Sequence, residues 1–183
     1  MIAIALDSPG SVIFIQKRAG KYSRPFSIFK FRTMSIAAPP DVATKELAGA
    51  HTYITRVGGF LRKTSLDELP QLWNILKGDM SFVGPRPVIL TETELLLLRR
   101  RLGADRIRPG ITGLAQVRGR DTVTIRHKAR YDAYYARHAS FRLDMRVIAD
   151  TVLCVLTADG IQEGDEAIVP SKRRKRQRQV RSR

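Results

Sequence analysis

Apolar and polar positions alternate in two segments near the start of the chain. Residues 11–16 are β-branched and aromatic, and in residues 25–34 a period of two places phenylalanines on one face, with Lys30 and Arg32 on the other. The basic residues 17–24 between them are turn-like. The pattern predicts a β-hairpin, and taken alone it favours an ordinary half-buried strand whose charges are solvated.

A helical period follows in the middle of the chain. Apolar residues recur every three or four positions over residues 64–77, which predicts a helix with one apolar face. Ser65 and Glu68 fit a capping box, whereas Pro70 favours a helix that begins there and leaves Asp67 and Glu68 on the preceding turn. In both registers the carboxylates lie near a helix N-terminus, which favours an ionised aspartate.

Three more helices are expected, over residues 91–102, 122–138 and 142–158, and residues 35–50 lack a clear period, which indicates a surface loop. With 43% hydrophobic residues the chain can bury one core. The predicted fold is an α+β single domain, mainly helical, with a small β-hairpin near the N-terminus.

Two proline-containing segments should form rigid turns. Two prolines make Gly84–Pro87 a non-helical elbow that holds Arg86 in a fixed direction, and residues 108–113 are expected to form a second tight turn. Residues 1–6 are an apolar run stopped by an Asp-Ser-Pro-Gly turn. That run is either a short buried element or the remnant of a longer anchor, and the residues alone do not choose between them.

Charge points to anionic partners. The net charge is +16, of which residues 171–183 contribute eight, so the remaining 170 residues keep +8. Nucleic acid, nucleotide phosphates and an acidic lipid surface all suit this balance. The single cysteine, Cys154, cannot form an internal disulfide, and the histidines show no metal-ligand spacing.

One constellation carries chemistry: the adjacent carboxylates Asp67 and Glu68. Phosphoryl transfer needs cations, a positioned nucleophile and usually Mg²⁺ held by one or two carboxylates plus substrate phosphates. One carboxylate could attack while its neighbour holds the metal. The cations expected around the pair are Lys30, Arg32, Arg62, Lys63, Arg86 and Arg120.

The specific signal is a resemblance that covers most of the chain. Its stretches are LDSPGSVIFIQKR at 6–18, PFSIFKFRTM at 25–34, ITRVGGFLRKTSLDELPQLWNILKGDMSFVGPRP at 54–87 and RPGITGLAQVRGR at 108–120. On these motifs the sequence resembles the bacterial sugar transferases, the monotopic phosphoglycosyl transferase family.

The resemblance implies a reaction. Asp67 would attack the β-phosphate of a UDP-sugar and release UMP, and a polyprenyl phosphate, typically undecaprenyl phosphate, would then take the sugar 1-phosphate. Glu68 would hold Mg²⁺. By motif, the phosphate contacts would be Lys30, Arg32, Arg62 and Arg86, and the residues lining the cleft would be Gln116 and Arg120.

The resemblance also implies a membrane location. The family has a hydrophobic re-entrant helix before the Asp-Ser-Pro-Gly turn, so residues 1–10 are interpreted as its remnant and turn, 11–165 as the catalytic domain and 166–183 as a disordered basic tail. Leu95–Leu98 and the 142–158 helix become candidates for amphipathic interfacial helices. We expect peripheral, salt-sensitive binding to anionic lipid at the cytoplasmic face of the bacterial inner membrane.

Two other classes of function stay open at this point. A basic nucleic-acid-binding protein suits the charge, but no recognition motif supports it and it leaves the carboxylate pair unexplained. An inactive membrane-docked scaffold would result from loss of the anchor. Neither the sugar nor the oligomeric state can be predicted from the sequence.

Overall fold

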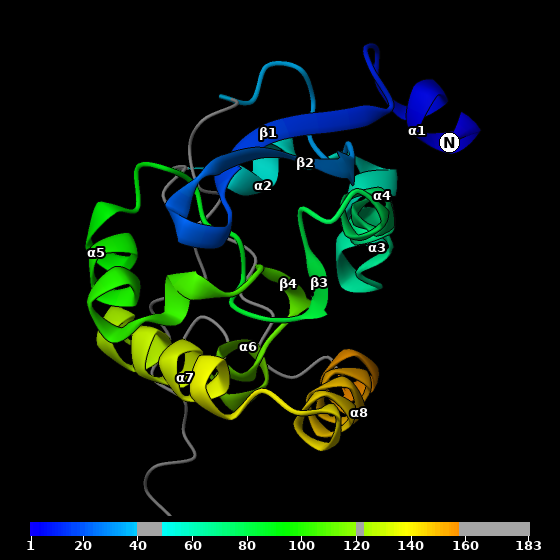
Figure 1. Ribbon diagram of the computed structural model, residues 1–183. Helices are drawn as coiled ribbons and strands as arrows, with labels where there is room; N and C mark the ends of the chain where they lie inside the picture. Colours follow the sequence, from blue (N-terminus) through cyan, green and yellow to red (C-terminus); the bar gives the residue numbers. More distant parts are fainter. Residues whose placement is uncertain (40–48, 120–122, 158–183) are drawn as a thin grey trace, which may run out of the picture.

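The computed structural model describes residues 1–39, 49–119 and 123–157 (Figure 1). After the short helix α1 (Ile2–Asp7), the predicted hairpin is present: β1 (Ile13–Ala19) pairs antiparallel with β2 (Pro25–Phe31). Strand β1 continues through basic residues that the pattern assigned to the turn. The connection instead turns at Tyr22 and Ser23, whose φ angles are positive.

The polar face of the hairpin points inward. Arg32 is 8% exposed and Gln16 6%, whereas Ile15, on the opposite face, is 58% exposed. The interpretation of the charges as solvated is therefore wrong for Arg32, and Lys30 is half-buried. The reason lies in the contacts of β2, which packs against α4 and the turn that precedes it.

The predicted helix over 64–77 is divided. Helix α3 (Arg56–Lys63), which follows the one-turn helix α2 (Ala50–Tyr53), is succeeded by a 3₁₀ turn at Leu66–Glu68 and then by α4 (Gln71–Leu76). Pro70 is the N-cap of α4, so the second of the two registers is confirmed. The capping box is wrong, because Ser65 has a left-handed backbone and its side chain makes no capping hydrogen bond.

The apolar face predicted for this segment exists, but it does not face the core. Leu72, Trp73 and Leu76 are 42–78% exposed, while Gln71 and Asn74 on the other side of α4 are almost fully buried. The polar side chains of α4 therefore point into the protein.

A second, parallel pair of strands lies at the centre of the molecule. Strand β3 (Ser81–Val83) pairs with β4 (Gly110–Thr112), so the segment expected to be only a tight turn contains a strand. A Cβ atom on Gly110 would lie 2.1 Å from the backbone nitrogen of Gly84. Glycine at position 110 thus permits the elbow and β4 to approach closely.

The helices complete the fold at the other end (Figure 1). The expected helices are α5 (Thr93–Leu102), α7 (Ile125–His138) and α8 (Phe141–Thr157), and α6 (Leu114–Gly119) is additional. The two core clusters centre on Val83, Leu114, Tyr135 and Val147, and on Val88, Leu95 and Ala129.

The mainly helical α+β prediction is confirmed, as is the small N-terminal hairpin. Leu95, one of the residues proposed for a membrane interface, belongs to the core. Within the described ranges, no helix combines the length and apolarity that a bilayer crossing requires. The domain boundaries stay predictions. The whole 166–183 tail and residues 40–48 of the 35–50 loop lie outside the described residues.

Helix α3 is held against the end of the hairpin by a close contact at Gly58. A Cβ atom on Gly58 would lie 2.0 Å from the carbonyl oxygen of Thr33. A Cβ atom on the neighbouring Gly59 would meet only a methyl carbon of Ile54, at 3.9 Å. The two glycines of one helix therefore have opposite packing requirements.

Gly58→Ala should destabilise the protein by about 1–3 kcal/mol or more, because α3 must move away from Thr33. Gly59→Ala is the matched control and should stabilise it by about 0.5–1 kcal/mol, since alanine favours the helix and the site has room. Urea unfolding followed by circular dichroism measures both. Equal effects of the two substitutions would contradict the packing described here.

Candidate active site

The 3₁₀ turn between α3 and α4 presents both carboxylates to the same region. The Asp67 side chain is 12% exposed and that of Glu68 14%. The turn packs on β2 on one side and on α3 on the other. Residues far apart in the sequence can thus meet at the two acids.

Glu68 binds two cations with one oxygen. Lys30 Nζ and Arg86 Nη2 both donate to Glu68 Oε1, each at 2.7 Å. Burial alone would raise the pKa of Glu68, but the charges of Arg86 and Lys30 and the hydrogen bonds they donate outweigh burial and hold the pKa well below its usual range. Glu68 is therefore ionised at neutral pH.

Asp67 has a different environment. Lys30 approaches it with 3.9 Å between Nζ and Oδ2. Burial raises the pKa of Asp67 above its ordinary value, and the negative charge of Glu68 adds to the rise, while Lys30, Arg86 and Arg62 oppose it. Desolvation therefore opposes the favourable effect that the sequence suggested for a nearby helix N-terminus.

Asn74 fixes the two carboxylates relative to Lys30. Its Oδ1 accepts from the backbone N–H of Phe29 at 3.1 Å, and its Nδ2 donates to the carbonyl of Ser27 at 2.7 Å. One fully buried amide thus occupies the outer edge of β2 on both sides of Ile28. This joins α4 to the strand that carries Lys30.

The elbow that carries Arg86 is anchored on three sides. The N–H of Ala19 donates to the Val88 carbonyl at 2.9 Å, and the N–H of Gly110 donates to the Pro85 carbonyl at 3.1 Å. The third anchor is Arg99, whose Nη1 donates to the carbonyl of Arg86 itself at 2.9 Å. These bonds fix the backbone of the elbow, and with it the point from which the Arg86 side chain extends.

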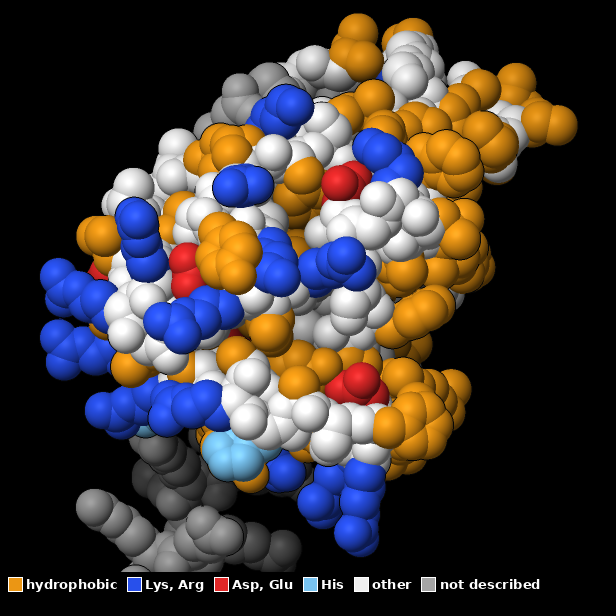
Figure 2. All heavy atoms as spheres, viewed as in Figure 1, with side chains coloured by type: hydrophobic (Ala, Val, Ile, Leu, Met, Phe, Trp, Pro, Cys, Tyr) orange, Lys and Arg blue, Asp and Glu red, His pale blue; other side chains and the backbone are white. Residues whose placement is uncertain are grey.

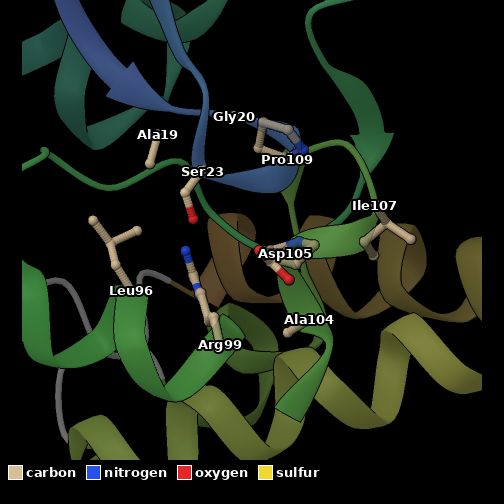
Figure 3. Close-up of a pocket in the computed structure, with 10 residues that line it drawn as sticks. Ala19, Gly20, Ser23, Leu96, Arg99, Ala104, Asp105, Ile107 and Pro109 are labelled. Carbon is tan, nitrogen blue, oxygen red and sulfur yellow. The ribbon is translucent and has the colours of Figure 1, made fainter. Parts of the chain in front are cut away.

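Arg99 is itself held by a buried ion pair. Its Nε and Nη2 approach Asp132 Oδ2 at 2.8 and 2.7 Å, and both side chains are under 9% exposed. Figure 3 shows Arg99 extending from α5 toward Ser23 of the hairpin turn, in a small pocket that Pro85 and Pro109 also line. Arg99 and Asp132, which the sequence patterns did not indicate, therefore act as positioning residues for the elbow.

Of the predicted phosphate contacts, Lys30 and Arg86 meet at Glu68, and Arg62 lies near enough to influence Asp67. Arg62 Nε also donates to Thr33 Oγ1 at 2.8 Å. Arg32 is placed differently, because its guanidinium donates to the carbonyls of Ser8 and Pro9. In this structure Arg32 holds the Asp-Ser-Pro-Gly turn against the hairpin.

Gln116, one of the two predicted cleft residues, makes its described contacts away from the carboxylates. Gln116 lies on α6, which packs on α7 and α8, and its Nε2 donates to the Ile111 carbonyl at 3.3 Å. Arg120 lies outside the described residues. The roles suggested for both by the resemblance stay predictions.

Two residues that the sequence patterns missed do join the site. Arg18 and Gln71 line a small pocket together with Lys30, Glu68 and Arg86. A usable signal was present for Gln71, since it and Asn74 are polar residues three positions apart in an otherwise apolar helix. Arg18 gave no such signal, because it stands in a run of basic residues.

Comparison with known proteins identifies the family of this chain. The family model described as "Bacterial sugar transferase" matches residues 1–158. The chain belongs to the bacterial sugar transferase family. The sequence-based identification is therefore confirmed, and with it the expectation of an enzyme.

Relatives of this sugar transferase are similar over most of the chain. An "Uncharacterized sugar transferase EpsL" from Bacillus subtilis is 37% identical over 163 residues, covering 89% of this chain and 78% of that protein. A UDP-glucose:undecaprenyl-phosphate glucose-1-phosphate transferase from Caulobacter vibrioides is 43% identical over 166 residues, covering 86% and 61%. One of the same name from Xanthomonas campestris is 39% identical, covering 85% and 34%. The chain thus spans only part of the length of these two named transferases.

A divalent cation fits the donor set of this sugar transferase only with help from a substrate. Within residues 1–39, 49–119 and 123–157, no group of three or more His, Cys, Asp and Glu side chains could hold a metal ion. Glu68 is ionised, as a metal ligand must be, and Asp67 is adjacent. This matches the way Mg²⁺ is usually bound, by one or two carboxylates together with substrate phosphates.

The opposite pKa shifts of the two acids give a testable pH dependence. Asp67 should titrate above its ordinary pKa of 3.8 and Glu68 below its ordinary 4.5. Lys30→Met should raise both pKa values, because the Lys30 charge lowers each of them. Carboxyl-carbon NMR titration measures this, with Asp67→Asn and Glu68→Gln used for assignment and Lys17→Met, an exposed lysine of β1, as control.

The lowered pKa of Glu68 also predicts how the stability of the protein depends on pH. Since the folded protein holds the pKa of Glu68 low, the contribution of Glu68 to stability is present above pH 4.5 and is lost as the pH falls below it. Lys30→Met should therefore lower the free energy of unfolding at neutral pH. The difference in this free energy between Lys30→Met and the wild type should become smaller in acid. A difference that is constant from pH 7 to pH 3 would contradict the assignment.

Proposed function

We propose that this sugar transferase moves a sugar 1-phosphate from a UDP-sugar to undecaprenyl phosphate through a covalent intermediate on Asp67. The observation that carries the proposal is the pairing of a poorly solvated Asp67 with a Glu68 that gathers Lys30 and Arg86. The names of the Caulobacter and Xanthomonas relatives support the donor and acceptor classes.

In the first step an oxygen of the Asp67 carboxylate attacks the phosphorus atom that bears the sugar. A bond forms between that oxygen and the phosphorus, and the bond from this phosphorus to the bridging oxygen of the pyrophosphate breaks. UMP leaves with the bridging oxygen and its electron pair. Lys30 and Arg86 lie where they can neutralise the charge that develops on the phosphoryl oxygens.

In the second step a phosphate oxygen of undecaprenyl phosphate attacks the same phosphorus atom. The bond to Asp67 breaks, the carboxylate is regenerated, and the sugar is left on a lipid diphosphate. The same cations serve both steps, so both steps are accelerated when these cations are held in fixed positions. The anchored elbow and the Asn74 contacts with β2 provide this fixed geometry.

Mg²⁺ belongs to the proposal as a cofactor held by Glu68 together with substrate phosphates. When bound, such an ion neutralises the charge of a pyrophosphate. Glu68 then has two roles. It would bind the ion, and its hydrogen bonds with Lys30 and Arg86 orient these two cations.

Asp67→Asn should fold normally and lose at least about 10³-fold in UMP release, because an amide is not an adequate nucleophile. The assay uses a panel of UDP-sugars with undecaprenyl phosphate, Mg²⁺ and detergent. Intact-mass spectrometry should detect a sugar-phosphate adduct on the wild type and none on Asp67→Asn. Glu68→Gln is the control for a general carboxylate effect, since it should reduce turnover yet keep Asp67 able to form the adduct slowly. An adduct on the Asp67→Asn protein would reject the assignment.

The membrane contact is a second part of the proposal. Figure 2 shows hydrophobic side chains gathered along the right-hand side of the molecule, over the elements labelled α1, α3, α4 and α8 in Figure 1. We call these side chains the apolar flank; its large members are Ile2, Leu6, Phe60, Leu72, Trp73, Leu76, Val152, Leu153 and Leu156, each at least 42% exposed. Soluble monomers rarely expose so many large apolar residues on one side, which favours contact with a bilayer.

Trp73→Glu combined with Leu76→Glu should reduce vesicle binding at about 1 M salt, where the Debye length is about 3 Å and charge attraction is screened. Deletion of residues 171–183 should instead reduce binding to anionic vesicles at low salt. Liposome flotation measures both. Leu97→Glu, which changes a 54% exposed leucine of α5 outside the apolar flank, is the control. Full binding by the double variant at high salt would reject this orientation.

A further inference from the structure

A pocket beside the carboxylates contains hydrogen-bond donors that the protein itself does not use. Among its lining residues are Arg18, Lys30, Gln71 and Arg86. Arg18 Nε and Gln71 Nε2 are buried and have no hydrogen-bond partner among the described residues. A buried donor without an acceptor costs about 1–3 kcal/mol, so a protein rarely keeps two in one place without a use.

The unpaired amide of Gln71 contrasts with the fully paired amide of its neighbour Asn74. The residue is 2% exposed, and its neighbour on the buried side of α4, Asn74, uses both ends of its amide for contacts with β2. Gln71 is thus the member of this pair that faces the pocket rather than the strand. Its buried amide nitrogen carries N–H groups that make no hydrogen bond to the described residues.

Arg18 adds charge at the same place. Its Nη2 donates to Gln16 Oε1 at 2.5 Å, which orients the guanidinium. Its Nε takes no part in this contact and has no hydrogen-bond partner among the described residues. Burial, together with the charge of Arg86, lowers the pKa of Arg18 to about 10. A cation held under such conditions is stabilised when an anion binds beside it.

We propose that Arg18 and Gln71 form an anion subsite that binds non-bridging phosphoryl oxygens of a substrate next to the carboxylate pair. This inference rests on the proposed function and extends it to two more residues. Three cations and one carboxylate line the pocket, so an anionic ligand matches its charge. A phosphate oxygen can also accept from both unpaired donors, whereas a neutral hydroxyl would leave the excess positive charge uncompensated.

The phosphate could belong to the pyrophosphate of the nucleotide sugar or to the lipid acceptor. Both present the same oxygens, and steady-state kinetics separates them. In Arg18→Met and Gln71→Leu the KM for the UDP-sugar rises if the donor occupies the subsite, and the KM for undecaprenyl phosphate rises if the acceptor does. Unchanged KM values for both substrates would overturn the proposal.

A second measurement requires no turnover. The probe is inorganic phosphate, titrated against the whole 183-residue chain at constant ionic strength with chloride as reference, and the readout is thermal stability. Arg18→Met and Gln71→Leu should each weaken phosphate binding about tenfold or more, the effect of losing one hydrogen bond to a charged group. Arg24→Met is the matched control, because Arg24 is an exposed arginine of the same hairpin, and it should bind phosphate like the wild type.

The free proteins provide the decisive contrast. Without phosphate, Gln71→Leu should be as stable as the wild type or more stable, because the substitution removes an unpaired buried donor. A lower melting temperature would indicate a structural role for Gln71 and would overturn the proposal, as would phosphate binding equal to that of the wild type. If no UDP-sugar is turned over but the variants still lose phosphate binding, the reaction proposed above fails while the anion subsite stands.

Discussion

Glu68 Oε1 is shared by two cations that come from different parts of the chain, Lys30 of the hairpin and Arg86 of the elbow. Without that carboxylate the two positive charges would repel each other in a half-buried place. With it, a compact cluster with excess positive charge can exist before any substrate arrives. The surrounding structure is arranged around this shared contact.

Hydrogen bonds to backbone groups hold the participants in position. Asn74 fixes β2 relative to α4, and Arg99 and the hairpin end fix the elbow by its carbonyl and amide groups. Such contacts tolerate changes at the surface while keeping the cluster fixed. Catalysis of phosphoryl transfer depends mainly on positioning and charge, so a cluster held in this way suits the proposed reaction.

The sequence predicted the hairpin, the three long helices and the carboxylate pair, because periodicity and motif both act locally. It failed where tertiary contacts decide. The pattern of β2 could not reveal which face points inward, and the apolar face of α4 implied burial although Gln71 and Asn74 are the buried side chains. Nor could the motif that assigned Arg32 to phosphate, an assignment that stays a prediction, reveal its contacts with the carbonyls of Ser8 and Pro9. Strand β4 has only three residues, too few to show an alternation of apolar and polar positions in the sequence.

Helix α4 has one further consequence. It presents Trp73 and Leu76 outward and Gln71 and Asn74 inward, within a single helix about 10 Å across including side chains. If the outward side rests on lipid, the reacting phosphorus lies roughly one helix width from the hydrocarbon. In the proposed reaction, a long-chain lipid phosphate would then need to rise only that far while its tail stays in the bilayer, and it would receive the sugar 1-phosphate at the boundary with water.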